Sequence, residues 1–137
     1  MSKKTFEEVI EEKGELIYTN LGDSMYPLIK DRDLLVIKRP SFPLHRLDIP
    51  LYKRENGQYV LHRIIKIREH DYIICGDNRT NKEYGITEEN VIGVLTHIIR
   101  NGRKISVYSL QKKLYAHLWS DVFLFRRGVL YLKRKLR

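Results

Sequence analysis

The stretch Glu55-Asn56-Gly57-Gln58 carries the strongest local signal in the chain, and it decides the class of fold. Asn and Gly both tolerate a positive φ angle, which the two central residues of a two-residue hairpin turn require. β-rich runs flank the stretch on both sides. We therefore predict a β-hairpin that pairs Arg54 with Tyr59. Counting back along both strands, this register places Leu51 opposite His62.

Outward from this hairpin, most of the chain follows the same pattern. Short runs rich in β-branched and aromatic residues alternate with turn residues. The predicted strands cover residues 16–19, 34–38, 49–54, 59–68, 72–75 and 91–100. A second Asn-Gly pair, Asn101-Gly102, predicts a hairpin that joins the last run to residues 104–108. The fold class is therefore mainly β, a core of hairpins with little helix.

Helices are predicted only near the two ends of the chain. Residues 5–13 place apolar side chains on one face, Thr5 and Glu8 form a capping box, and a glycine follows. In residues 110–137, apolar side chains recur every three or four positions, and basic side chains flank them. We predict a basic amphipathic helical tail there, bent or divided at an internal glycine. The chain accordingly divides into a β domain with an N-terminal helix, residues 1–109, and the tail.

Composition and charge limit the classes of function. A chain of 137 residues with 42% hydrophobic residues fits one compact domain and excludes a wholly disordered protein. No run of about 20 apolar residues occurs, so an ordinary membrane-spanning helix is not predicted. Residues 1–99 hold 15 Lys and Arg against 16 Asp and Glu, whereas residues 100–137 hold 11 against one. The basic excess predicts an anionic partner for the tail, either the inner face of a membrane or another anionic surface.

The first residues and the cysteine content bear on location and cofactors. The stretch Met1-Ser2-Lys3-Lys4-Thr5-Phe6-Glu7-Glu8 turns acidic where a signal peptide would be apolar, so no export signal is predicted. The one cysteine, Cys75, allows neither an intrachain disulfide nor a cysteine-based zinc site. Four further histidines lack the spacing of metal ligands: His45, His70, His97 and His117. We expect a cytoplasmic protein without metal or cofactor, held peripherally at the inner face of the membrane if the tail binds there.

Three short stretches carry residues suited to nucleophilic chemistry. Ser24 follows a predicted strand and precedes a proline turn, so its hydroxyl projects from a loop edge. His62 lies between apolar neighbours on a predicted strand, where partial burial favours the neutral imidazole. The third stretch is the turn Gly76-Asp77-Asn78. A serine hydroxyl needs a base within reach and a carboxylate that orients that base, so Ser24, His62 and an acid within residues 77–83 form a candidate set.

Five motifs, taken in order, carry a family resemblance. They are Gly22-Asp23-Ser24-Met25-Tyr26-Pro27, Asp33-Leu34-Leu35-Val36-Ile37-Lys38, Leu61-His62-Arg63-Ile64-Ile65, Gly76-Asp77-Asn78 and Asn90-Val91-Ile92-Gly93. In order and spacing they resemble the motifs of type I signal peptidases, whose clan includes the self-cleaving SOS-type repressors. The bacterial branch has a lysine at the position of His62, and a histidine there resembles the endoplasmic-reticulum and sporulation type.

The resemblance implies a signal-peptidase-like β core and a serine endopeptidase without a cofactor. It places the nucleophile at Ser24 and the general base at His62, a histidine whose apolar neighbours predict an apparent pKa in the neutral range. The acid that orients His62 falls on Glu83, six residues after Asp77, or on Asp77 itself. Backbone N–H groups of Gly22 and Ser24 would hold the oxyanion. The implied substrate is a precursor protein or peptide with small residues before the cleaved bond.

The chain departs from the family pattern at several positions. A membrane anchor usually precedes the serine motif, whereas a short charged helix is predicted there in this chain. Gly22 stands where the family often has a serine whose hydroxyl binds the oxyanion. Residues 79–83 replace the Ser-x-Asp that usually follows Gly-Asp-Asn. In a second interpretation, Asp77 holds its turn through side-chain-to-backbone hydrogen bonds and Glu83 is a solvated loop carboxylate.

Alternative interpretations stay open for the body and for the tail. The body could be a catalytically inactive relative that binds a peptide, a protein or an anionic partner in the same groove. The apolar stripe of the tail could pack on the β body instead of a membrane. Nucleic acid is not a predicted partner, because the sequence contains no helix-turn-helix, zinc-finger or RNA-binding signature.

Overall fold

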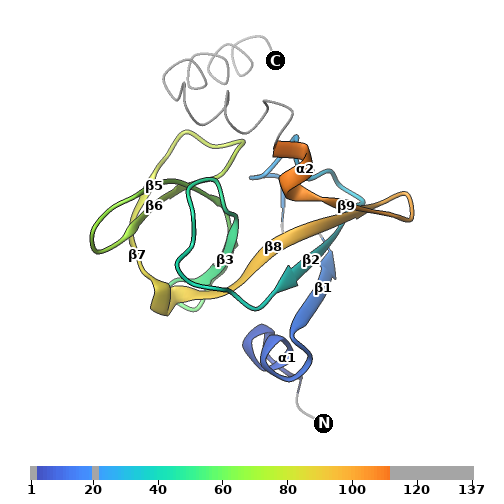
Figure 1. Cartoon of the computed structure of the whole chain (residues 1–137), viewed down its shortest axis with the longest axis horizontal. Coiled ribbons are helices and arrows are strands. Elements are labelled where there is room, and N and C mark those ends of the chain that lie inside the picture. Colours follow the sequence, from blue (N-terminus) through green and yellow to red (C-terminus); the bar gives the residue numbers. More distant parts are fainter. Residues whose placement is uncertain (1–2, 20–21, 112–137) are drawn as a thin grey trace.

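The computed structural model describes residues 3–19 and 22–111. This part of the chain is mainly β, with an antiparallel sheet that curls on itself and a short helix towards each end (Figure 1). The predicted fold class, mainly β, is therefore confirmed. Nearly all of the tail predicted over residues 110–137 lies outside the described residues, and so does its predicted amphipathic helix.

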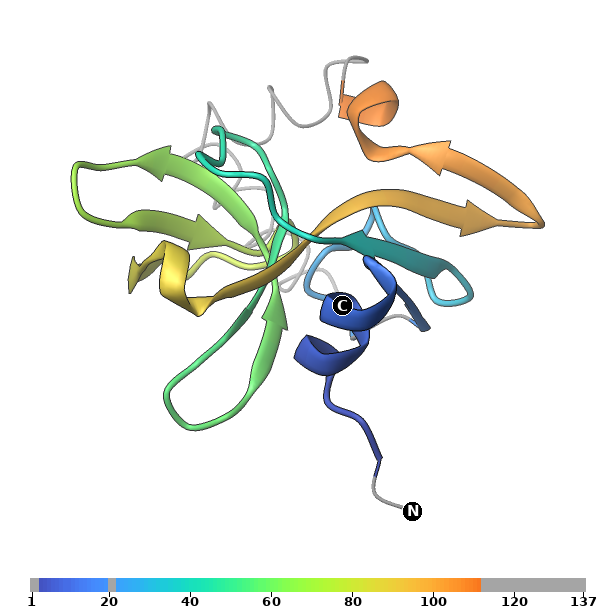
Figure 2. The same cartoon turned by 60° about the horizontal axis from the view of Figure 1, so that its bottom comes forward.

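Six strands of the described residues form the larger sheet, in the order β1-β2-β8-β3-β4, with β9 also paired to β8. They are β1 (Glu15–Thr19), β2 (Leu34–Lys38), β3 (Pro50–Lys53), β4 (Tyr59–Leu61), β8 (Val91–Arg100) and β9 (Arg103–Ser106). The long β8 crosses the molecule (Figure 2) and pairs with β2 along one edge and with β3 and β9 along the other. Bulges in the β2–β8 and β3–β8 pairs bend the sheet.

The smaller sheet of the described residues has the order β5-β6-β7. Its strands are β5 (Arg63–Ile67), β6 (Tyr72–Cys75) and β7 (Glu83–Ile86). His62 alone separates the end of β4 from the start of β5, so the run predicted as one strand over residues 59–68 is two strands in different sheets. β7 was not predicted, because its four residues include a glycine and lack an apolar run; in the structure Gly85 has a φ of 80°.

The second Asn-Gly pair forms the turn that the sequence predicts. Asn101 and Gly102 have φ angles of 53° and 76°, and Arg100 pairs with Arg103 across them. Both central residues are therefore left-handed, as a two-residue turn requires. The predicted hairpin between β8 and β9 is confirmed.

The first Asn-Gly pair lies in a longer loop, and the predicted register is wrong by one residue. Tyr59 pairs with Lys53 rather than with Arg54. Leu51 lies opposite Leu61. His62, the predicted partner of Leu51, lies beyond the end of β4. A one-residue change of register moves every side chain of a strand to the other face.

The side chain of Asn56 makes a hydrogen bond inside this longer loop. Its carbonyl oxygen accepts a hydrogen bond from the Gln58 N–H at 2.9 Å. Of the two residues predicted to be left-handed, Gly57 alone is, with a φ of 89°. The Arg54 N–H donates to the Gln58 carbonyl at 2.9 Å, so the loop contains the three residues between them and ends on a left-handed glycine, a common alternative to the two-residue turn.

The predicted N-terminal helix is present as α1 (Phe6–Lys13). It has the predicted capping box, and Gly14 ends it with a φ of 78°. The helix packs on the larger sheet at Gly93 of β8, where a Cβ atom would lie 2.6 Å from Ile37 and 3.1 Å from Ile10. The absence of a side chain at Gly93 thus lets helix and sheet approach closely.

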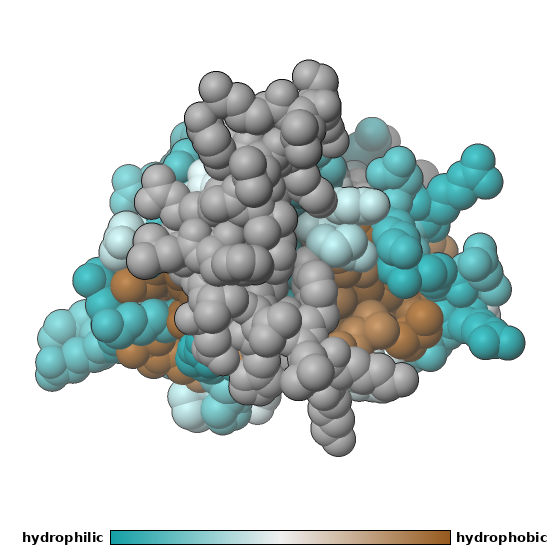
Figure 3. Space-filling view, turned by 90° about the horizontal axis from the view of Figure 1, so that it is seen from above, coloured by the Kyte–Doolittle hydropathy of each residue, from teal (hydrophilic) through white to brown (hydrophobic). Residues whose placement is uncertain are grey.

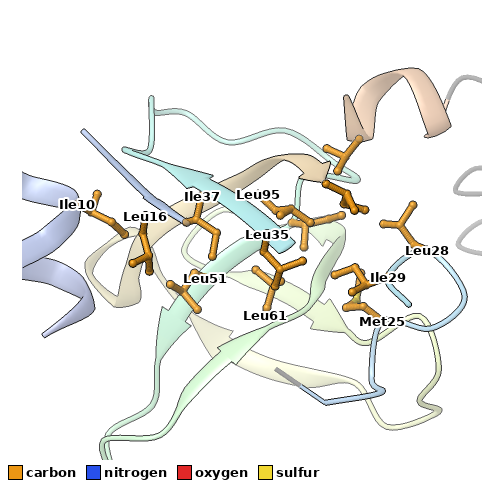
Figure 4. Close-up of a cluster of buried hydrophobic side chains, with 13 residues drawn as sticks. Ile10, Leu16, Met25, Leu28, Ile29, Leu35, Ile37, Leu51, Leu61 and Leu95 are labelled. Carbon is orange, nitrogen blue, oxygen red and sulfur yellow. The ribbon is translucent and has the colours of Figure 1, made fainter. Parts of the chain in front are cut away.

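Two apolar clusters fill the interior. The first includes residues of α1, of the larger sheet, of the loop after β1 and of α2 (Val107–Gln111), as Figure 4 shows. Its members are Ile10, Leu16, Met25, Leu28, Ile29, Leu35, Ile37, Ile49, Leu51, Leu61, Leu95, Ile98 and Val107. The second draws on both sheets and contains Leu44, Tyr52, Val60, Ile64, Tyr72, Ile74, Ile86, Val91 and Val94. Because Leu51 and Tyr52 belong to different clusters, β3 is buried on both faces.

Candidate active site

Ser24 lies in the loop between β1 and β2, which the first apolar cluster anchors. The side chains of Met25 and Ile29 are each 2% exposed, and the Ile29 N–H donates to the Met25 carbonyl at 3.0 Å. The Tyr26 N–H closes a turn on the Asp23 carbonyl at 3.1 Å. Ser24 itself is half-buried. Its position is therefore fixed by buried neighbours rather than by the packing of its own side chain.

The turn after β6 holds the Ser24 loop from the other side. The Asn78 N–H donates to the Ser24 carbonyl at 2.7 Å, and the Asp77 N–H donates to the Met25 sulfur at 3.4 Å. The side-chain amide of Asn78 donates to the Asp23 carbonyl at 3.2 Å. The serine motif and the Gly-Asp-Asn motif, which are distant in sequence, thus form one interlocked unit.

His62 and the Ser24 loop meet at Gly76. A Cβ atom on Gly76 would lie 2.8 Å from the Ser24 carbonyl oxygen and 3.1 Å from Nε2 of His62, so only glycine permits this approach. Ser24 and His62 also line one pocket of about 290 Å³, together with Arg54 and Arg79. Among the described residues no hydrogen bond joins the Ser24 hydroxyl to His62, and the Ser24 atom that approaches Gly76 is the backbone carbonyl oxygen.

His62 is a neutral imidazole in this site. Burial, helped by the positive charge of Arg54 and opposed by Glu83, lowers the pKa of His62 from 6.5 to about 4. Its ring packs edge-on against Tyr52, with 6.4 Å between the ring centroids. The sequence predicts titration in the neutral range, whereas burial between the two sheets moves the pKa of the imidazole below that range. The ring is therefore uncharged at neutral pH and accepts a proton at one of its nitrogens.

Glu83 is connected to His62 through Tyr52. The Tyr52 hydroxyl donates to Oε1 of Glu83 at 2.7 Å and lies 3.4 Å from Nδ1 of His62. The guanidinium of Arg54 donates hydrogen bonds to the same carboxylate, at 2.9 to 3.3 Å. Burial would raise the pKa of Glu83, but the hydrogen bonds from Arg54 and Tyr52 outweigh it and hold that pKa below its ordinary value. The predicted acid is thus near the base, with a tyrosine between them.

Tyr52 and Arg54 are site residues that sequence reasoning missed. The register of the β3–β4 hairpin decides which side chain of β3 lies on the His62 side, and the predicted turn put Leu51 there. The three-residue loop moves the strand by one position, so Tyr52 lies opposite Val60 and on the side of His62. Predicting a three-residue loop from the sequence would have given the correct register and so would have placed Tyr52 on the same side as His62.

Asp77 pairs with Arg63 of β5. Its carboxylate accepts two hydrogen bonds from the guanidinium, each of 2.8 Å, and both side chains are 1% exposed. Arg63 also donates to the Leu47 carbonyl at 3.1 Å. Sequence analysis offered Asp77 as the orienting acid or as a structural residue of its turn. Its carboxylate is committed to Arg63, an arginine that was not singled out, and Glu83 is the acid connected to His62.

The backbone N–H groups predicted to hold the oxyanion belong to residues that line the pocket, Gly22 and Ser24. Within the described residues neither N–H donates a hydrogen bond. Gly22 has a φ of 107°, which favours glycine, and a Cβ atom there would meet nothing within 4 Å. Both residues thus line the pocket that contains Ser24, and a side chain at Gly22 would meet no neighbour there.

The described residues show no cluster that would hold a metal ion. In residues 3–19 and 22–111, no three His, Cys, Asp or Glu side chains lie close enough together to form a metal site. The same residues include no helix long and apolar enough to cross a membrane. Comparison of the chain with protein-family models, with curated proteins and with solved structures found no match.

Proposed function

We propose that the chain is a serine endopeptidase of the signal-peptidase type, with Ser24 as nucleophile and His62 as general base. One observation carries the proposal: a neutral, largely buried imidazole places Nε2 beside the Ser24 loop at Gly76, and both residues line one pocket. Proton abstraction from a serine hydroxyl requires such a neutral base close to the serine. The resemblance of the five motifs supports the same assignment.

The proposed reaction uses these two side chains in turn. The Ser24 oxygen bonds to the substrate carbonyl carbon while its proton passes to Nε2 of His62. The carbonyl oxygen becomes an oxyanion, for which the N–H groups of Gly22 and Ser24 supply donors. The carbon–nitrogen bond then breaks, and the leaving amine takes the proton from His62. Water attacks the resulting ester in the same way, with His62 accepting the proton of water and returning it to Ser24.

The proposed substrate is a precursor protein or peptide with small residues before the cleaved bond. We further propose that the tail attaches the enzyme to the anionic inner face of a membrane, beside such precursors. The charge distribution supports this, since the basic excess lies in residues 100–137. Seen from above, the described residues expose apolar surface in two places, one on each side of the view (Figure 3).

A second candidate function is a catalytically inactive module that binds a peptide in the same pocket. The observation that favours it is the missing hydrogen bond between the Ser24 hydroxyl and His62 among the described residues. Catalytic hydrogen bonds are often long in free enzymes and tighten when substrate binds, so the observation does not exclude catalysis. The two candidates differ in one outcome, the production of new peptide N-termini.

The test is therefore a cleavage assay that needs no known substrate. The full chain is incubated with a proteome-derived peptide library, and new N-termini are labelled and identified by mass spectrometry. We expect new termini with the unchanged protein and none with Ser24→Ala or His62→Ala. Ser41→Ala is the matched control, because Ser41 is an exposed loop serine outside the pocket. Binding of library peptides without any cleavage would establish the second candidate instead.

A further inference from the structure

The hydroxyl of Tyr52 stands between the candidate base and the candidate acid. It lies 2.7 Å from Oε1 of Glu83 and 3.4 Å from Nδ1 of His62. Tyr52 is 0% exposed, and its ring is held in the second apolar cluster. The position of this hydroxyl is therefore set by the core, independently of any substrate.

The direction of the hydrogen bonds follows from the number of protons. A phenol has one proton, and the closer and stronger acceptor is the Glu83 carboxylate, which Arg54 keeps ionised. Burial and the neighbouring carboxylate raise the pKa of Tyr52 far above its ordinary value, so the hydroxyl keeps that proton. The Tyr52 oxygen then has only lone pairs to present to His62. An accepting oxygen at 3.4 Å favours the neutral imidazole whose proton is on Nδ1.

We propose that Tyr52 is a positioning residue that fixes the tautomer and the orientation of His62, and that Glu83 acts on His62 through it. In this arrangement Nδ1 is protonated, and Nε2 is the free acceptor beside Gly76 and the Ser24 loop. In an ordinary serine triad a carboxylate accepts the Nδ1 proton directly. Here a tyrosine–glutamate pair does so, anchored by Arg54. The catalytic part of this inference rests on the proposed function, whereas the tautomer does not.

The first test measures the tautomer in the full chain. Ring ¹⁵N chemical shifts distinguish protonated from unprotonated imidazole nitrogens, and the His62 signals are assigned by their loss in His62→Gln. At neutral pH we expect a protonated Nδ1 and an unprotonated Nε2. A protonated Nε2 in the unchanged protein would overturn the inference without any further variant.

The second test removes the hydroxyl. Tyr52→Phe keeps the ring but deletes the acceptor, so the His62 proton should become shared between the two nitrogens. Tyr59→Phe is the matched control, because the Tyr59 hydroxyl also donates to a carboxylate, that of Glu7 at 2.6 Å. Tyr59→Phe should leave the tautomer of His62 unchanged. An unchanged tautomer in Tyr52→Phe would overturn the inference; should that variant not fold, the unchanged protein's spectrum decides.

Kinetics separate this inference from the proposed function. With a cleavable peptide, Tyr52→Phe should lower kcat within the roughly 10²- to 10⁴-fold that general acid–base catalysis supplies, and leave KM nearly unchanged. An unchanged protein that cleaves nothing but has the expected tautomer would refute the proposed function and keep the positioning role. Conversely, a fully active Tyr52→Phe with an unaltered His62 spectrum would refute the positioning role and keep the peptidase.

Discussion

Gly76 is the residue on which the approach of Ser24 and His62 depends. A methyl group there would lie 2.8 Å from the Ser24 carbonyl oxygen and 3.1 Å from the imidazole, too close for either neighbour. We expect Gly76→Ala to push the loop and the ring apart, to cost about 1–3 kcal/mol of stability, and to abolish cleavage. As water enters, the pKa of His62 should rise towards 6.5, which an NMR titration measures.

Gly102→Ala is the control for this substitution. Gly102, in the turn between β8 and β9, has a φ of 76° with nothing within 4 Å of a Cβ atom, so alanine there is strained but displaces no neighbour. It should lower the stability and leave the pKa of His62 near 4. Equal titration curves for Gly76→Ala and the unchanged protein would mean that the close approach at Gly76 does not shape the site.

The low pKa of His62 gives the site a defined pH dependence. Between pH 6.5 and about 4 the unfolded chain binds a proton at His62 that the folded chain does not. The free energy of unfolding should therefore fall as the pH is lowered through this window, and denaturation should show a smaller fall for His62→Gln. Peptide cleavage should be constant from pH 6 to 8 and half-maximal near pH 4. A half-maximal rate near pH 6.5 would mean that the ring is solvated in the working enzyme.

Short sequence motifs predicted part of the candidate site, whereas the register of one hairpin determines which other residues belong to it. Ser24, His62 and the Gly-Asp-Asn turn lie within recognisable short motifs, and the structure brings them together. Tyr52 and Arg54 stand in no such motif. Their roles depend on the exact register of the β3–β4 hairpin, which no single residue encodes.

At the scale of elements, two identical dipeptides formed different turns. Asn101-Gly102 joins β8 to β9 with both residues left-handed, whereas the side chain of Asn56 binds the backbone two residues on, and Gly57 alone is left-handed. Such an Asx contact competes with the two-residue turn in any Asn-Gly sequence. The strand boundaries at β2, β6 and β8 were predictable because apolar runs end there at turn residues. The break at His62 was not, since the apolar pattern continues through it.

The buried pair of Asp77 and Arg63 joins β5 to the turn after β6. We expect Asp77→Ala to cost about 3–5 kcal/mol in urea denaturation, because it leaves the Arg63 charge buried without its partner. Arg79→Ala breaks the ion pair with Asp23, whose side chains are 46% and 68% exposed, and should cost about 1 kcal/mol or less. Similar losses for the two variants would show that the buried pair does not hold the turn.

At the scale of the whole molecule, the site forms where the two sheets meet. The chain leaves the larger sheet at β4 and enters the smaller one at β5, and His62 is the residue at the crossing. Its surroundings come from both sides: β3 contributes Tyr52, and β7 contributes Glu83. A sequence pattern detects strands but not their assignment to sheets, so the site could be predicted only in outline.

The tail is the other feature that belongs to this scale. It follows α2, and it carries six basic residues near its end: Arg126, Arg127, Lys133, Arg134, Lys135 and Arg137. Each adds about 1 kcal/mol of attraction near an anionic leaflet. Apolar side chains in the same segment would supply the second signal that stable peripheral binding needs.

We expect the full chain to co-sediment with vesicles that contain anionic lipid at low salt, and to bind neutral vesicles much less, because salt screens the attraction of the basic tail. Replacing the six basic residues by Gln should abolish binding while the β body stays folded. The matched control replaces six exposed basic residues of the body by Gln, with the same change in net charge: Lys3, Lys13, Arg32, Lys66, Arg103 and Lys104. Equal loss of binding in both variants would show that net charge acts rather than the tail, and a full chain that ignores anionic vesicles would remove the membrane from the proposed function.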